Sequence, residues 1–437
     1  MIDQVLMGGG LKLLGKVTGS GLVERMGWRG KAEEVVNAGA RAGFKAAQAV
    51  APVVARLSRA GARLPARPKP AAFDLGLDEE QQLFEASASR FAMSRFRPAA
   101  RAADEGCAPP EGLMQSCWQE LGLGLMAVPE ALGGAGAERA PLSNAIVIEA
   151  LARGDMALAL AAAAPLGVIN ALVDFGSEAQ QARWLAPFNQ GDFVPAALAL
   201  VEPHPLFDPL RLKTRATLKE GQYTLYGSKA LVPLGRSAGF FLVAAEILGG
   251  GPAIFIVERD ARGLSIAHEP SMGLRGADLC RLTLDGVRVP REALLGERAP
   301  GWDYGALIDK ARIGWGALAV GSSQAVLDYV VEYCNGRVAF GEPITHRQSV
   351  AFAIADAATE LEGMRLLVQR AASRADVGMP CGREAFLARL QCADKGMKIG
   401  ADGVQLLGGH GFVKDHPVEL WYRHLRAVGL MEGALCV

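Results

Sequence analysis

The sequence has few of the features that mark secreted, metal-binding or nucleic-acid-binding proteins. Its seven cysteines are scattered without a C-x-x-C pair, which indicates reduced thiols rather than a disulfide framework or a zinc site. Lys and Arg together number 46, and so do Asp and Glu, so no overall charge bias favours nucleic acid. It lacks any run of 18 apolar residues and an apolar secretory signal core. We therefore expect a cytoplasmic protein without a membrane span.

Charge is distributed unevenly along the 437 residues. Residues 1–70 carry twelve Lys or Arg and four Asp or Glu, a net charge of 12 − 4 = +8, so residues 71–437 carry −8. Between Lys31 and Ala60 apolar side chains recur at roughly helical spacing, and the Pro-rich segment 64–70 favours an extended linker. A basic helix with an apolar side is typical of attachment to anionic membranes. We predict peripheral contact with the inner face of the membrane through residues 1–60; packing on the rest of the chain is the alternative.

The pattern of the remaining chain changes twice. Helical periodicity follows Asp78, a predicted N-cap, and one helix is expected to end at Gly176. From Val194 to Gly296, short runs rich in β-branched and aromatic residues predict a compact antiparallel unit, and long helices return after Trp302. This order predicts an α+β fold. The expected parts are an N-terminal extension with linker (1–72), a helical domain (73–193), a β-domain (194–300) and a second helical domain (301–437).

Several short phrases follow one another in a fixed order. They are VPEALGG at 128–134, FGSEAQ at 175–180, Glu202-Pro203, LYGSK at 225–229, MGLRG at 272–276, RVAFG at 337–341, QLLGGHG at 405–411, Pro417-Val-Glu419 and Glu432-Gly433. In this order they resemble the acyl-CoA dehydrogenase family from about residue 73 to 437. The resemblance implies an N-terminal helical domain, a middle β-barrel or sandwich domain and a C-terminal four-helix bundle. It also implies bound FAD, a homotetramer or homodimer, and an electron-transfer flavoprotein as a partner.

Glu432 is the candidate catalytic base. Removal of the α-proton of a thioester needs a carboxylate whose pKa is raised toward the working pH by apolar surroundings. The sequence neighbours of Glu432, residues 429–431 and 433–435, are apolar or glycine and include no opposite charge. From the residues alone, a surface glutamate in a frayed tail is the alternative. The resemblance implies that Glu432 takes the α-proton while the β-hydride goes to flavin N5, and that the backbone N–H of Glu432 binds the thioester carbonyl.

The resemblance also implies further contacts with substrate and cofactor. The substrate-binding residues are expected to be Asp309, Arg312 and Gly433. The cofactor-binding residues are expected to be Val201, Leu231, Pro233, Arg337, Phe340, Gln348, Gln405, Gly408, Gly409 and Ala434. The alternatives are a helix-surface cation for Arg312 and a simple helix break for the two glycines 408 and 409.

The chain departs from the family pattern at three of these positions. Val201 stands where a Thr or Ser is usual, and Leu231 and Pro233 replace an aromatic and a hydroxyl beside the flavin. These losses favour an alternative, a non-catalytic membrane-associated binding or assembly protein on the same fold. Retention of Glu432 and Arg312 favours an enzyme of fatty-acid metabolism that converts acyl-CoA to trans-2-enoyl-CoA. A flavin oxidase or monooxygenase is a third alternative, although such proteins commonly lack the base.

Overall fold

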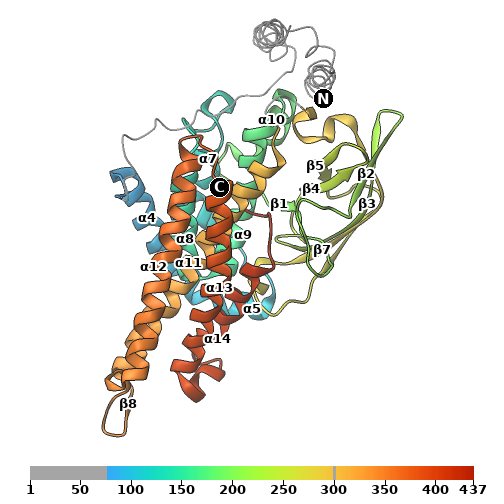
Figure 1. The fold of residues 1–437 in the computed structure, drawn as a ribbon. Coiled ribbons are helices and arrows are strands. Elements are labelled where there is room, and N and C mark those ends of the chain that lie inside the picture. Colours follow the sequence, from blue (N-terminus) through green and yellow to red (C-terminus); the bar gives the residue numbers. More distant parts are fainter. Residues whose placement is uncertain (1–75, 299–301) are drawn as a thin grey trace, which may run out of the picture. The chain divides into compact units, whose positions relative to one another are not determined.

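The computed structural model describes residues 76–298 and 302–437. The segment predicted to contact a membrane, residues 1–60, and the linker 64–70 lie outside the described residues, so that contact remains a prediction. In the described part, helices come first, strands follow, and long helices return (Figure 1), which confirms the α+β class and the three-part architecture.

The first described helix begins where the sequence supplies a cap. The Asp78 carboxylate accepts a hydrogen bond from the Gln81 backbone N–H at 2.8 Å, and the Gln81 side chain accepts one from the Asp78 N–H at 3.2 Å. This reciprocal capping box satisfies two backbone donors at the start of the first described helix. The elements that follow are α4 (Glu79–Phe91), a π-helical turn (Ala92–Phe96), α5 (Arg97–Gly106), α6 (Leu113–Leu121), α7 (Leu123–Ala127), α8 (Pro141–Gly154), α9 (Met156–Phe175) and α10 (Glu178–Trp184).

Helix α9 lies at the centre of the fold because it is apolar on every side. Asp155 caps it by accepting a hydrogen bond from the Leu158 N–H at 2.9 Å. Its length and composition would suffice to cross a membrane, but the whole of its apolar window is buried inside the described fold, as in the core helix of a globular protein. The helix ends at Phe175 with Gly176 as its C-cap in an extended conformation (φ −62°), which confirms the predicted end of a helix at this glycine. Glycine fits there because a Cβ would approach Leu172 O.

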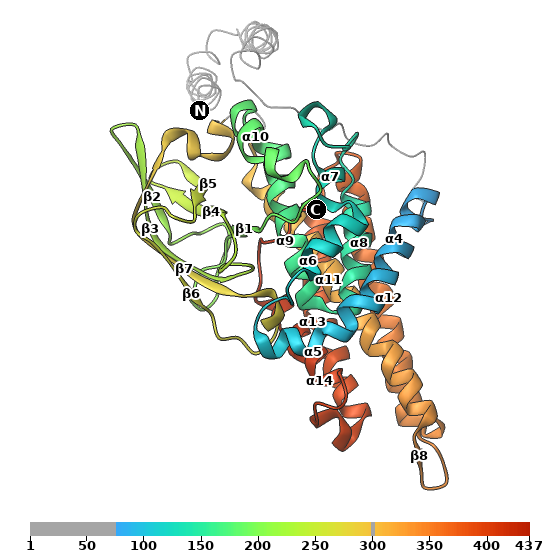
Figure 2. The same ribbon diagram turned by 180° about the vertical axis from the view of Figure 1, so that it is seen from behind.

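The middle of the chain forms a seven-stranded sheet (Figure 2). Its strands are β1 (Ala196–Ala199), β2 (Arg215–Lys219), β3 (Gln222–Val232), β4 (Phe240–Ile247), β5 (Gly251–Glu258), β6 (Leu264–His268) and β7 (Cys280–Pro290). The spatial order is β1-β4-β2-β3-β7-β6, with β5 paired to β4. The expectation of a purely antiparallel unit was wrong, since β4 runs parallel to both β1 and β2. Parallel neighbours need a long connection, and the β2–β3 hairpin between β1 and β4 is part of it.

A buried ion pair joins the end of β1 to β3. Lys229 Nζ lies 2.9 Å from Glu202 Oε1 and donates to Leu200 O at 3.1 Å, and the Lys229 side chain is fully buried. Glu202 also accepts hydrogen bonds from the backbone N–H groups of Lys213 and Thr214 at 2.7 and 2.8 Å. Burial opposes ionisation of Glu202, but Lys229 and these hydrogen bonds outweigh it and lower its pKa to about 2. The pair therefore fixes the chain around residues 200–202.

Long helices make up the C-terminal part. They are α11 (Tyr304–Gly336), α12 (Gln348–Asp376), α13 (Gly382–Leu406) and α14 (Val418–Leu425). Helix α11 packs against α8, α12 and α13. The small hairpin of β8 (Val338–Ala339) and β9 (Glu342–Pro343) joins α11 to α12 and extends away from the β-domain in both views (Figures 1 and 2). After a 3₁₀ turn (Arg426–Gly429), residues 430–437 run without regular structure.

Replacing Lys229 by methionine tests the buried ion pair. Lys229→Met leaves the Glu202 carboxylate buried without its cation, so we expect the free energy of unfolding to fall by about 3 kcal/mol. The double variant Glu202→Gln/Lys229→Met has no uncompensated charge, so its free energy of unfolding should fall by less than that of the single variant. Urea denaturation of the wild type and the two variants measures these free energies. Equal stability of Lys229→Met and wild type would contradict this role of the pair.

Candidate active site

Glu432 lies in the irregular segment that follows the last helical turn, and it is almost completely buried, with 5% of its surface exposed. The segment Met431–Val437 is buried throughout. The alternative of a surface glutamate in a frayed tail is therefore wrong. A carboxylate enclosed in this way needs compensating charge or hydrogen bonds.

Two arginines supply that charge. Arg312 of α11 donates from Nε to Glu432 Oε2 and from Nη2 to Oε1, both at 3.3 Å. Arg389 of α13 places Nε 3.0 Å from Oε1. The expectation of apolar surroundings without an opposite charge was thus wrong, because two helices distant in sequence bring guanidinium groups to the carboxylate.

Asp309 joins the same cluster from one turn earlier on α11. Its carboxylate lies 3.8 Å from Arg312 Nη1. Burial raises the pKa of Asp309; Arg312 opposes the shift, and Asp303 and Glu432 add to it. Arg312 therefore faces two carboxylates at once and is no solitary surface cation. The structure brings together the three residues Asp309, Arg312 and Glu432, as the sequence predicted for base and substrate-binding groups.

The segment after Glu432 is fixed by close contacts with α9 and α11. Gly433 has a φ of +67°, and its carbonyl accepts a hydrogen bond from Trp315 Nε1 at 2.7 Å. A Cβ on Gly433 would lie 2.7 Å from Leu200 Cβ, so only glycine allows this approach to the end of β1. Asn170 of α9 donates to Cys436 O at 2.7 Å. Ala434, also predicted near the cofactor, is buried here with a φ of +64°.

The three positions that depart from the family pattern lie together at the same place. The Ala230 N–H donates to Val201 O at 2.9 Å, so the residues after β1 lie beside the end of β3, where Leu231 and Pro233 follow. Val201 and Pro233 are buried, and Leu231 is half-buried with a φ of +55°. Val201, Leu231 and Pro233 (the apolar platform) lie at these neighbouring strand ends, and Leu200, which precedes Val201, adjoins Gly433. The platform and the charged cluster around Glu432 are thus joined through the contact of Leu200 with Gly433.

The other predicted cofactor residues lie far from Glu432 within one chain. Arg312 and Gly336 are 336 − 312 = 24 residues apart on α11, a separation of about 36 Å at about 1.5 Å per residue. Arg337, which follows, is exposed, and so are Phe340 and Gln348 near the β8–β9 hairpin. Gln405, Gly408 and Gly409 are exposed at the same end of α11, where Tyr333 Oη lies 2.8 Å from His410 Nδ1. These six residues form a second cluster, separate from the first.

Sequence reasoning missed Arg389 and Trp315. Arg389 precedes Glu432 by 432 − 389 = 43 residues, and Trp315 is separated from Gly433 by 118. Each resembles an ordinary helix residue in the sequence. Only the packing of α11 and α13 places Arg389 against Glu432 and Trp315 against Gly433. No local signal distinguishes them.

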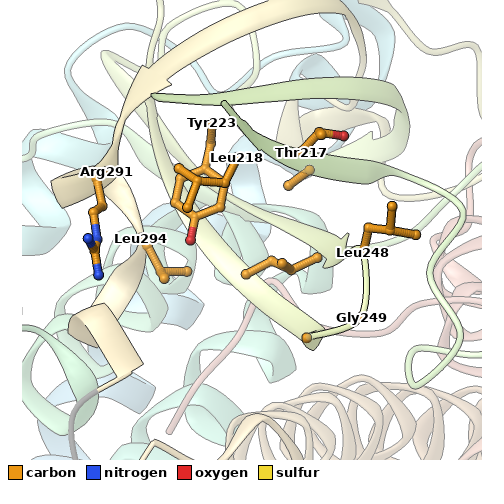
Figure 3. A pocket seen from close by; sticks show the side chains of 10 residues that line it. Thr217, Leu218, Tyr223, Leu248, Gly249, Arg291 and Leu294 are labelled. Atoms are coloured by element: carbon orange, nitrogen blue, oxygen red, sulfur yellow. The ribbon is translucent and has the colours of Figure 1, made fainter. Parts of the chain in front are cut away.

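A hollow of about 470 Å³ in the β-domain lies outside this site (Figure 3). Its wall includes Tyr223, Leu248, Arg291 and Leu294, and none of the predicted site residues lines it. This hollow therefore does not coincide with the charged cluster around Glu432.

Comparison with known proteins agrees with the geometry. Three family models match in order: acyl-CoA dehydrogenase N-terminal domain over residues 78–192, middle domain over 197–287 and C-terminal domain over 301–435. The chain belongs to the acyl-CoA dehydrogenase family. An acyl-CoA dehydrogenase of Bacillus subtilis (strain 168) is 34% identical over 362 residues, which cover 81% of this chain and 94% of the relative.

Two further relatives of this acyl-CoA dehydrogenase family member have named specificities. The mitochondrial short-chain specific acyl-CoA dehydrogenase of Bos taurus is 32% identical, with 82% of this chain and 87% of the relative covered. The structure of butyryl-CoA dehydrogenase from Megasphaera elsdenii superimposes with a TM-score of 0.75 at 30% identity, covering 83% of this chain and 96% of that chain. The likeness extends over the whole described fold, including the segment that carries Glu432.

Substitution of Gly167 tests the close packing of α9 against the segment that follows Glu432. A Cβ at this position of α9 would lie 2.7 Å from Ala434 O and 2.9 Å from Cys436 N, both backbone atoms. Gly167→Ala should therefore lower the free energy of unfolding by about 1–3 kcal/mol, as overpacking does. The control is Gly363→Ala in α12, where nothing lies within 4 Å of the added Cβ; a helical glycine replaced by alanine should gain up to about 1 kcal/mol. Urea denaturation compares them, and equal effects would contradict the packing argument.

Proposed function

We propose that this protein oxidises an acyl-CoA thioester between its α- and β-carbons, with Glu432 as the base that removes the α-proton. The observation that carries the proposal is a buried carboxylate beside the apolar platform at the ends of β1 and β3, in a chain of the acyl-CoA dehydrogenase family. Arg312 and Arg389 hold this carboxylate through three contacts of 3.0–3.3 Å.

The residues around Glu432 divide the remaining tasks. Trp315 holds the carbonyl of Gly433, and Gly433 rests on Leu200, so the peptide carrying Glu432 has a fixed direction. Its backbone N–H is then available to polarise a thioester carbonyl, an electrostatic effect of the oxyanion-hole type. Burial of Met431–Val437 excludes water from the proton transfer. We assign the binding of the polar part of a CoA ester to Arg312 and Asp309, which adjoin Glu432.

The residues present fit FAD as the cofactor. The platform of Val201, Leu231 and Pro233 offers apolar contact to an aromatic ring beside Glu432, in place of side-chain hydroxyls. Gly408 and Gly409 are exposed, with open space where a Cβ would be, so their backbone groups can approach a pyrophosphate closely. When bound, FAD supplies the acceptor for the β-hydride.

Both clusters serve one cofactor only if subunits associate. The roughly 36 Å along α11 separates the platform end from Arg337, Phe340 and Gln348. We infer that the second cluster of one subunit contacts the cofactor held at the first cluster of another, within a homodimer or homotetramer. Exposed apolar side chains on α12 and α13 suit such contacts: Phe352, Leu366, Phe386, Leu387 and Leu390. An electron-transfer flavoprotein is the proposed recipient of the electrons.

The non-catalytic alternative is less well supported. It rests on the loss of polar groups at Val201, Leu231 and Pro233. Against it stands the retention of Glu432 beside Arg312 and Asp309, an arrangement that suits a base with substrate-binding groups.

Flavin binding is the first test of the proposal. The purified protein should be yellow, and denaturation should release FAD, identified by chromatography against FMN and FAD standards. If the protein stays colourless after reconstitution with FAD, the dehydrogenase proposal fails.

Glu432→Gln should retain flavin but lose its bleaching by butyryl-CoA. A positioned general base contributes about 10²–10⁴-fold, so stopped-flow reduction should slow by at least about a hundredfold. The control is Glu111→Gln, an exposed glutamate that precedes α6, which should reduce at the wild-type rate. A Glu432→Gln rate above about a tenth of wild type would place the base elsewhere.

A further inference from the structure

Arg389 contacts both Glu432 and the residue before it. Its Nη2 donates to Met431 O at 3.1 Å, while its Nε faces Glu432 Oε1 at 3.0 Å as an ion pair rather than an aligned hydrogen bond. Residues 430–437 have no strand or helix to fix them. A guanidinium that binds a backbone carbonyl and the next carboxylate restricts both the path of the chain and the direction of the side chain.

The two arginines are not equivalent. Arg312 is shared, since its guanidinium faces Asp309 at 3.8 Å as well as Glu432 at 3.3 Å and lies 5.7 Å from the centre of the Phe386 ring. Arg389 makes the shorter contact, and among residues 76–298 and 302–437 it forms an ion pair with Glu432 alone. Removal of Arg389 would therefore act on Glu432, whereas removal of Arg312 would also disturb Asp309.

We propose that Arg389 is a positioning residue for the base: it fixes the path of residues 431–432 and the direction of the Glu432 carboxylate before the substrate binds. This inference rests on the proposed role of Glu432 as the base. A base transfers a proton efficiently only when its carboxylate is held in the right place relative to the α-carbon. The two contacts of Arg389 restrict the conformations that Glu432 can adopt.

The other titratable groups around Glu432 lie on α11. They are Arg312, Asp309 and Tyr304. Burial raises the pKa of Tyr304, whose hydroxyl donates to Pro209 O at 2.9 Å, so this group stays neutral. Burial lowers the pKa of Arg389 itself, with Glu432 opposing and Arg312 adding to the shift, which indicates that the two guanidinium groups repel each other across the carboxylate they share. Loss of Arg389 therefore removes one of two cations and leaves the anion Asp309 in place.

The test compares Arg389→Gln, Arg389→Lys and wild type by stopped-flow flavin reduction at several butyryl-CoA concentrations, which separates the limiting rate from the half-saturating concentration. In Arg389→Gln the carboxylate loses its fixed direction, so the limiting rate should fall by about tenfold while the half-saturating concentration changes little. Arg389→Lys keeps the positive charge but lacks the planar guanidinium, so it should restore only part of the limiting rate. The control is Arg383→Gln, an exposed arginine on the same helix, which should leave both quantities unchanged.

A second measurement uses no substrate and no flavin. Thermal unfolding of Arg389→Gln, Glu432→Gln and the double variant forms a double-mutant cycle, in which residues in contact give non-additive effects. Additive effects together with a wild-type limiting rate in Arg389→Gln would overturn the inference. A wild-type rate in Glu432→Gln would instead overturn the proposed function, and non-additive unfolding would still show that the contact exists.

Discussion

A carboxylate that has been removed from water must find its compensation within the protein, and this requirement shapes the part of the fold around Glu432. The side chain is enclosed, so α11 and α13 each have to place a guanidinium against it. The irregular segment 430–437 can follow its path because these cations, and the indole of Trp315, bind it at successive positions. The relative position of α11 and α13 therefore determines which guanidinium groups reach Glu432 and where its carboxylate points.

A second buried carboxylate, at the end of β1, needs compensation in the same way. Glu202 is buried at the end of β1 and is compensated by Lys229 of β3, which also binds Leu200 O. Leu200 in turn is the residue on which Gly433 rests. Two buried carboxylates, one in the sheet and one among the helices, are thus connected through a single leucine and a single glycine. Loss of either ion pair would therefore be expected to shift the peptide that carries Glu432.

Sequence patterns predicted the parts of this structure that depend on local interactions. The capping box at Asp78, the apolar helix α9 and the alternation of helical and strand regions all follow from neighbouring residues. The position of Glu432 followed from a phrase shared with a family, whereas its surroundings did not: residues 429–435 are apolar, but the charges come from helices 43 and 120 residues away. For the same reason the parallel pairing of β4 with β1 and β2 was missed, because strand direction is decided by connections rather than by composition.

The length of α11 has a consequence for the genetics of this protein. The helix places Arg312 near one end and Arg337 just past the other, so each subunit would carry the base for its own cofactor and an anchor for its neighbour's. A variant defective only at Arg337 would then lose a cofactor contact in the neighbouring subunit's site. A variant defective only at Glu432 would lose the base in its own site. In a mixed assembly, the subunit that retains Glu432 could receive an intact Arg337 from the subunit that lacks the base. Two inactive alleles would complement each other, and co-expression would restore at most one working site per pair.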